Sequence, residues 1–194
     1  MLTSLIASAK EYLVPELDVT DAGPSLDDQP LVPSGKPNEM PAGVLFKTEP
    51  NKWYLLKAHY TDKNGKPASG YAFPLGSSPP LSFWDYVVFG SSPDGCEPLQ
   101  FQPVPDNNDP KAWEFWRIRD NKCNAGYHMD CKATGWLYRG SNYDTKFRIV
   151  DGKLYCSYWG GPAGSQFRAG LVPDGQYLGM GLPVFTCELE EVKA

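Results

Sequence analysis

Short runs of alternating apolar and polar residues follow one another from residue 44 to near the end of the chain. A period of two residues is typical of a β-strand with one buried face. Gly, Pro, Asn, Asp and Ser gather between the runs, as turns require. The runs that predict strands lie at residues 44–47, 52–60, 82–90, 97–104, 112–120, 126–133, 135–140, 146–150, 153–156, 165–171, 175–180 and 183–192. The pattern therefore predicts an all-β domain of about twelve short strands.

The clearest pair of strands lies at residues 146–156, KFRIVDGKLYC. Asp-Gly is a favoured pair for a two-residue type I′ turn, which requires a positive φ at both central positions. If residues 151 and 152 form that turn, Ile149 lies opposite Leu154, and Phe147 lies opposite Cys156. These four side chains then share one buried face, while the other face is mostly solvated.

Twelve short strands within about 150 residues suit a β-trefoil, a closed β-barrel or a β-sandwich. The length matches three units of about 50 residues, which favours a β-trefoil-like fold over the other two. The last apolar run, at residues 183–192, is well placed to pair with an early strand.

Residues 1–43 differ in composition from the rest of the chain. Residues 1–13 predict a short amphipathic helix, because apolar side chains recur near one face. Residues 14–43 are rich in Pro and acidic residues and predict a linker or an extended arm. Serine interrupts the first apolar stretch, and Lys10 and Glu11 follow it, so no signal peptide is visible. We therefore expect two regions, 1–43 and a single domain at 44–194, in a cytoplasmic or non-classically secreted protein.

Composition and charge narrow the range of partners. The chain has a net charge of −5 and no Lys/Arg run, which argues against nucleic acid as a ligand. No apolar stretch reaches the length of about 20 residues that a membrane-spanning helix needs. The five cysteines include no C-x-x-C spacing. They suit either free buried thiols in a cytosolic protein or two disulfides and one spare thiol in a secreted one.

The stretch from Phe147 to Tyr155, followed by Cys187 near the C-terminus, resembles a recurring stretch in small secreted and cell-wall β-proteins of filamentous fungi. That resemblance covers about 45 residues. It implies a non-enzymatic β-protein that is secreted or displayed at a surface. The chain departs from those proteins because it shows no signal peptide.

The candidates for catalysis are few. His128 and Asp130 point to the same side of a strand, as two ligands of a metal site or a base and its orienting carboxylate would. His59, near Asp62, is a third candidate. No known catalytic, nucleotide-binding or metal-binding motif accompanies them. We therefore expect no metal and no cofactor, and we favour a protein that is not an enzyme.

Aromatic side chains beside polar groups and glycines suggest a ligand surface. A sugar presents a C–H face that packs on an aromatic ring, and its hydroxyls need polar partners at the edge. We expect Trp136 and Trp159 to be partly exposed at strand ends, with Asp85 and Asn142 as polar partners. The alternative for Trp136 and Trp159 is that both rings pack the end of the barrel. Further candidate ligand-binding residues are Trp84, Tyr138 and Tyr158.

Three functions follow from these features. The first is a non-catalytic, lectin-like protein that recognises carbohydrate through exposed aromatic residues. The second is a small β-barrel enzyme that acts on an apolar small molecule, with His128 and Asp130 as acid and base. The third is an effector, toxin or inhibitor that binds another protein through a Pro/Gly-rich loop at residues 61–82 or 91–111. The sequence leaves the identity of the ligand and the oligomeric state open.

Overall fold

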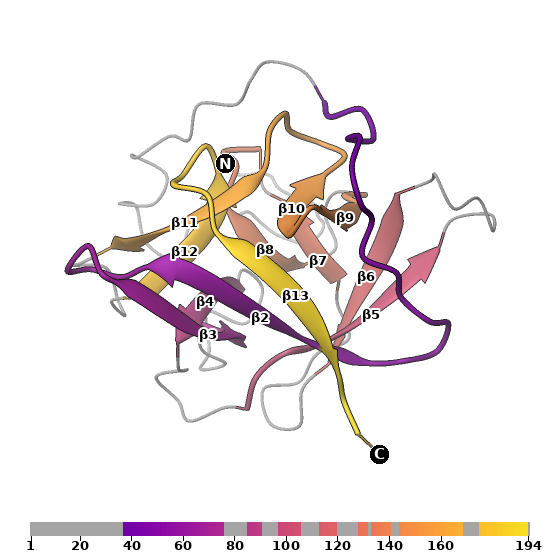
Figure 1. Ribbon diagram of the computed structural model, residues 1–194, viewed down its shortest axis with the longest axis horizontal. Coiled ribbons are helices and arrows are strands. Elements are labelled where there is room, and N and C mark those ends of the chain that lie inside the picture. Colours follow the sequence, from indigo (N-terminus) through magenta and orange to yellow (C-terminus); the bar gives the residue numbers. More distant parts are fainter. Residues whose placement is uncertain are drawn as a thin grey trace, which may run out of the picture.

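The computed structural model of the chain, shown in Figure 1, describes residues 37–75, 85–90, 97–105, 113–119, 128–131, 133–140, 144–168 and 175–193. Within these ranges the chain forms twelve strands and no helix, so the expected all-β class is confirmed. The strands are β2 (Tyr54–Thr61), β3 (Pro67–Pro74), β4 (Asp85–Gly90), β5 (Gln100–Pro105), β6 (Glu114–Arg119), β7 (His128–Cys131), β8 (Leu137–Gly140), β9 (Phe147–Val150), β10 (Lys153–Cys156), β11 (Ala163–Arg168), β12 (Gly175–Met180) and β13 (Thr186–Glu191). The helix expected at residues 1–13 lies outside the described residues.

Seven strands close into a barrel. Hydrogen-bonded pairing runs from β2 through β3, β4, β8, β7, β6 and β5 and back to β2. A closed barrel, one of the expected architectures, is therefore confirmed. The remaining five strands extend this ring, with β9 and β10 joined at β6, β12 and β11 joined at β4, and β13 joined at β2. Figure 1 shows β13 lying along β2 across the front of the molecule, which confirms that the last strand pairs with an early one.

Further contacts join the ends of these extensions. The backbone N–H of Cys187 at β13 donates to the carbonyl oxygen of Gly152, directly before β10, at 2.8 Å. β4 pairs with both β12 and β8. Trp136, directly before β8, forms a β-bridge with Gly179 of β12. The strands β4, β8 and β12 therefore meet one another, although they come from three separate parts of the chain.

The β9–β10 hairpin has the predicted register. Ile149 lies opposite Leu154 and Phe147 opposite Cys156, and both central turn residues have positive φ, 51° at Asp151 and 75° at Gly152. These values are those of a type I′ turn. The apolar face is buried as expected, since all four of these strand residues are at most 3% exposed.

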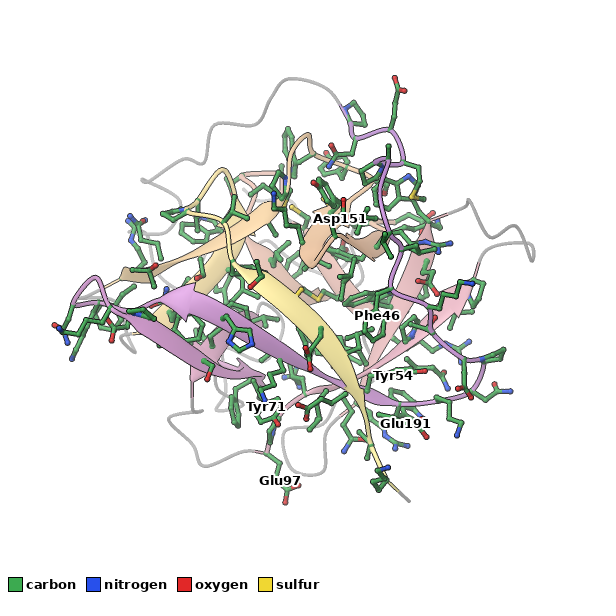
Figure 2. The ribbon with its side chains drawn as sticks, in the orientation of Figure 1. Phe46, Tyr54, Tyr71, Glu97, Asp151 and Glu191 are labelled. Atoms are coloured by element: carbon green, nitrogen blue, oxygen red, sulfur yellow. The ribbon has the colours of Figure 1, made fainter. Side chains whose placement is uncertain are left out.

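The opposite face of this hairpin was expected to be mostly solvated, and this is wrong for Arg148 and Val150, which are 4% and 2% exposed. Residues 44–46 lie along the edge of β9 next to Val150. Leu45 forms a β-bridge with Val150, and the N–H of Phe46 donates to Ile149 at 2.9 Å. Figure 2 shows Asp151 beside this N-terminal segment. A segment about 100 residues away in sequence thus pairs with the edge of the hairpin.

One predicted strand and one predicted loop differ from the structure. Residues 44–47 contribute one bridge rather than a strand. Residues 67–74, which fall in the segment 61–82 expected to be a loop, form β3 between β2 and β4. Prolines occupy the first and last positions of β3, where proline is tolerated in a sheet. The strand predicted at residues 97–104 is confirmed as β5, which lies inside the Pro/Gly-rich segment 91–111.

The core divides into two clusters. The larger one combines side chains from the barrel strands and from the strands that extend them, such as Leu56, Phe101, Trp116 and Phe147. The smaller one lies where β4, β8 and β12 meet, and it consists of Leu75, Tyr86, Val88, Trp136, Tyr138 and Tyr177. No helix within the described residues has the length and apolar character needed to cross a membrane.

Candidate functional site

The connection between β10 and β11, residues 157–162, presents an aromatic pair. Tyr158 is 38% exposed, and its ring lies edge-on to the ring of Trp159 at 4.9 Å between centroids. Trp159 is half-buried and packs against the barrel core. This segment, called the aromatic loop below, therefore holds one exposed ring on a second ring that is anchored in the core.

Asn38 holds the backbone of the aromatic loop. Its side-chain Nδ2 donates to the carbonyl oxygens of Cys156 and Gly161, each at 3.0 Å, and also to that of Trp159. Its Oδ1 accepts the N–H of Gly161 at 2.8 Å. One amide side chain thus satisfies both ends of the loop from a position 118 residues earlier than Cys156, which limits the conformations that the exposed ring samples.

Polar groups adjoin the start of the aromatic loop. The N–H of Ser157 donates to the carbonyl oxygen of Lys146 at 2.8 Å, and the Ser157 hydroxyl accepts the Lys146 N–H at 3.1 Å. The Lys146 ammonium forms an ion pair with Asp144 at 2.9 Å. The Ser157 hydroxyl and the backbone of Lys146 therefore lie at the start of the segment that carries Tyr158.

Trp136 and Tyr138 are both 0% exposed, so the expectation that Trp136 is partly exposed is wrong. The Trp136 ring packs edge-on against Tyr177 at 6.1 Å, within the cluster between β4, β8 and β12. The Arg168 guanidinium lies 5.5 Å from the ring centroid. Trp136 is therefore a residue of the buried core and does not form part of a ligand surface.

The remaining members of the predicted aromatic site are only partly described. Asp85 lies in β4, opposite Arg139 in register. Trp84 and Asn142 lie outside the described residues. Of the predicted ligand-binding residues, the structure therefore brings Tyr158 and Trp159 together in one place, and it separates them from the buried Trp136 and Tyr138.

His128 and Asp130, the predicted acid–base pair, lie in two different environments. His128 is half-buried against the ring of Phe115, with 4.0 Å between centroids, and burial lowers its pKa, aided by the nearby positive charge of Arg117. Asp130 is 0% exposed. Its carboxylate accepts hydrogen bonds from the Thr145 hydroxyl, from the Cys131 N–H at 2.9 Å and from the Tyr138 hydroxyl at 3.4 Å. These bonds give Asp130 a structural role in the core.

The third predicted acid–base candidate, His59, lies in a shallow groove on the outer face of the barrel. His59 is exposed on β2, between Ser69 of β3 and Thr186 of β13 in register. The groove has a volume of about 470 Å³. Its lining consists of His59, Tyr60, Thr61, Gly65, Pro67, Ala68, Ser69, Val184 and Thr186. Sequence reasoning missed Ser69 and Thr186, because only the pairing of strands brings them to the imidazole.

The acidic neighbour expected for His59 has another role. Asp62 accepts the backbone N–H groups of Asn64 at 2.8 Å and Lys66 at 2.9 Å, and these bonds hold the pKa of Asp62 below its usual value. Asp62 therefore stabilises the turn between β2 and β3, and it is not among the residues that line the groove.

A buried charged pair lies beneath the N-terminal segment. Glu114 and Arg148 are each 4% exposed, with 3.7 Å between Glu114 Oε1 and Arg148 Nε. The Thr48 hydroxyl donates to the other Glu114 oxygen at 2.8 Å. Burial raises the pKa of Glu114, while Thr48 and Arg148 oppose that shift. The sequence gives no direct sign of this pair, because Arg148 sits at a position expected to be solvated.

No protein-family model, curated protein or solved structure matches the chain significantly. The geometry of the aromatic loop and of the His59 groove is therefore the basis for the function proposed below.

Proposed function

We propose that the protein is a non-catalytic carbohydrate-binding protein whose ligand packs on Tyr158. The observation that carries this proposal is the exposed Tyr158 ring, held edge-on to the anchored Trp159 in a loop that Asn38 fixes. A sugar ring gains apolar contact with such a surface, and the rigid loop lowers the entropy lost on binding. Ser157 and the Lys146–Asp144 pair provide polar partners for sugar hydroxyls.

The fold that we propose for this protein is a β-trefoil. Support comes from the order of pairing, in which β2, β5, β6, β9, β10 and β13 also follow one another around a ring. The other six strands form the hairpins β3–β4, β7–β8 and β11–β12, which meet through β4, β8 and β12. This arrangement divides the chain into three consecutive units of four strands, as expected of a trefoil.

The experiment is a glycan array with the wild-type protein and with Tyr158→Ala. We expect the wild type to bind a defined set of glycans and Tyr158→Ala to lose about tenfold in affinity, because the removed ring carries the apolar contact. His59→Ala is the matched control, an exposed aromatic side chain outside the aromatic loop, and it should bind as the wild type does. A wild-type protein that binds no glycan would remove the proposal.

A second candidate is an enzyme or binding protein for a small polar molecule at the His59 groove. Its volume of about 470 Å³ lies within the range of small-molecule sites, and the imidazole lies between two hydroxyl-bearing side chains. Loss of ligand binding in His59→Ala, with binding retained in Tyr158→Ala, would place the site at the groove instead. The third candidate is a protein that binds another protein through a loop. In the described part of segment 61–82, the loop available for this role is the β2–β3 turn at residues 62–66.

A further inference from the structure

The outer face of strands β5 and β6, which Figure 1 shows side by side, carries two exposed arginines. Buried and exposed side chains alternate along β6, so Arg117 and Arg119 both point to solvent, on the side opposite the core. In register, Gln102 lies opposite Arg117 and Gln100 lies opposite Arg119. These four residues are called the arginine face below.

The two glutamines orient the guanidinium groups. Arg119 Nε donates to Gln100 Oε1 at 2.8 Å, and Arg117 Nη1 donates to Gln102 Oε1 at 3.4 Å. The Arg119 guanidinium carbon also lies 4.1 Å from the centroid of the Trp53 ring, which is a cation–π contact. Both guanidinium groups are thus partly fixed before a ligand arrives, and this lowers the entropy lost on binding.

The two arginines keep most of their hydrogen-bonding capacity. A guanidinium group has five N–H donors in a fixed fork. Within the described residues, Arg117 and Arg119 form no ion pair, whereas Arg148 pairs with Glu114. An arginine fork binds a carboxylate through two parallel hydrogen bonds. The arginine face is therefore suited to a ligand that carries carboxylates.

The charge of the arginine face is opposite to that of the whole chain, whose net charge is −5. His128, which lies opposite Arg117 on β7, adds no charge near neutral pH. Burial and the positive charge of Arg117 lower the pKa of His128, and only Asp144 acts in the opposite direction. Salt screens charges beyond about 8 Å at physiological ionic strength. A ligand at this face therefore responds to the two arginines more than to the net charge.

The spacing of the two arginines matches that of an extended peptide. Residues two apart on a strand project to the same side, and their Cα atoms lie about 6.6–6.8 Å apart. A peptide that runs along β6 with Asp or Glu at alternate positions repeats at the same distance, so it brings one carboxylate to each guanidinium. Gln100 uses its Oε1 as an acceptor for Arg119, and its NH2 group remains a donor for a backbone carbonyl of such a peptide.

We propose that the arginine face binds an acidic segment of a partner protein, in extended conformation and with Asp or Glu at alternate positions. Each carboxylate accepts two hydrogen bonds from one guanidinium, and the stacking of Arg119 on Trp53 sets the direction of one fork. The proposal uses no residue of the aromatic loop, so it does not rest on the carbohydrate-binding function.

The test is fluorescence anisotropy with the full chain and three labelled peptides. The first peptide alternates Glu and Thr. The second has the same composition but places Glu in adjacent pairs separated by two Thr, so no two Glu residues are two positions apart. The third replaces every Glu of the first by Gln. We expect the wild type to bind the alternating peptide about fivefold more tightly than the paired one, and the Gln peptide not at all. Equal affinity for the two acidic peptides, or no binding of the alternating peptide, would overturn the proposal.

Variants locate the binding surface. Arg117→Gln and Arg119→Gln should each weaken binding of the alternating peptide about fivefold, and the double variant should weaken it at least about tenfold. Arg119→Lys keeps the charge but loses the fork, so it should also bind more weakly than the wild type. Lys153→Gln is the matched control, because it removes one positive charge from an exposed position on β10, and it should bind as the wild type does. Equal binding by the double variant and by Lys153→Gln would contradict the assignment of the face.

A polysaccharide that carries sulfate or carboxylate groups is the alternative occupant. Heparin and polygalacturonate serve as probes for it in the same assay. If either binds the wild type and not the double variant, while the alternating peptide does not bind, the face belongs to an anionic glycan and the proposal is wrong. The double variant should bind neutral glycans as the wild type does, since the aromatic loop is unchanged, so the two proposals fail separately.

Discussion

At the scale of single residues, burial sets the chemistry of the groups that matter most. Glu114 and Arg148 form an ion pair inside the protein because Thr48 and its neighbours cover them. Removing a carboxyl group from water disfavours its charged form, and neither Arg148 nor Thr48 fully offsets this cost, since the pKa of Glu114 remains raised.

This shift predicts how stability depends on pH. A carboxyl group whose pKa is higher in the folded protein than in the unfolded chain binds more protons when folded, so the free energy of unfolding falls as pH rises. The contribution of Glu114 is fully present below its unfolded value of 4.5 and is lost as pH rises through the raised pKa. We expect urea unfolding between pH 4 and 8 to show a shallower decline in Glu114→Gln than in the wild type.

Glu191→Gln is the control for this measurement. Lys52 lowers the pKa of Glu191 by a hydrogen bond, so this exposed group contributes stability above its unfolded pKa of 4.5 and loses it as pH falls. The change in slope in Glu191→Gln should therefore be small and opposite in sign. Equal slopes in Glu114→Gln and the wild type would show that the Glu114 carboxyl does not titrate differently on folding.

A second prediction at this scale concerns Gly164, where two segments approach closely. A Cβ atom at this position would lie 2.2 Å from the carbonyl oxygen of Leu182 and 2.4 Å from that of Pro183. The Pro183 oxygen is also the acceptor for the Ser165 N–H, at 2.9 Å. We expect Gly164→Ala to lower the free energy of unfolding by about 3 kcal/mol, because the backbone itself must shift.

Gly152→Ala provides the comparison for Gly164→Ala. Its φ of 75° strains any other residue, but no atom lies within 4 Å of the added Cβ. We expect it to lower the free energy of unfolding by about 1 kcal/mol. If urea unfolding gives equal losses for the two variants, the close approach at Gly164 is not the dominant effect.

At the scale of elements, local signals determine some strands and distant segments determine others. The β9–β10 hairpin was predictable down to its register, because Asp-Gly fixes the turn and alternation fixes the faces. β3 was not, because the composition of residues 67–74 is typical of a loop and the strand depends on pairing with β2 and β4. Residues 44–47 show the opposite error, because their apolar run predicts a strand and the chain contributes only the bridge between Leu45 and Val150.

The hairpin turn itself carries the third prediction. Asp151 has a φ of 51°, and its Oδ1 accepts the N–H of Val44 at 2.8 Å. Asn tolerates this backbone conformation and keeps the acceptor oxygen, whereas Ala does neither well. We expect Asp151→Ala to lower the free energy of unfolding by about 1–2 kcal/mol and Asp151→Asn by less than about 0.5 kcal/mol. A loss as large in Asp151→Asn as in Asp151→Ala, measured by urea unfolding, would assign the effect to the charge instead.

At the scale of the whole molecule, the candidate site depends on contacts that no local pattern encodes. Trp136 and Trp159 both lie beside glycines at strand ends, and the sequence gives them the same expectation of partial exposure. The fold distinguishes them, because Trp136 is buried against Tyr177 in the cluster between β4, β8 and β12, while Trp159 is only partly buried in the loop that Asn38 holds. The closed all-β architecture was predictable from periodicity, but the positions of the exposed rings were not.

Closure of the molecule depends on its last strand, which carries the final prediction. β13 pairs with β2 from Thr186 to Glu191, and the N–H of Cys187 joins it to Gly152 beside β10. Figure 2 shows Tyr54 and Glu191 at the same end of the β2–β13 pair. Ending the chain after Phe185 removes Leu189 from the core and leaves one edge of β2 without backbone partners. Unpaired edges favour association between chains. We therefore expect this truncated chain to aggregate on size-exclusion chromatography and to lose cooperative thermal unfolding.

The control is a chain that ends after Val192. It keeps all of β13 and the hydrogen bond from the Val192 N–H to the carbonyl oxygen of Trp53, at 2.8 Å, and it should unfold as the wild type does. A chain ending at Phe185 that stays monomeric and unfolds cooperatively would show that the barrel closes without β13.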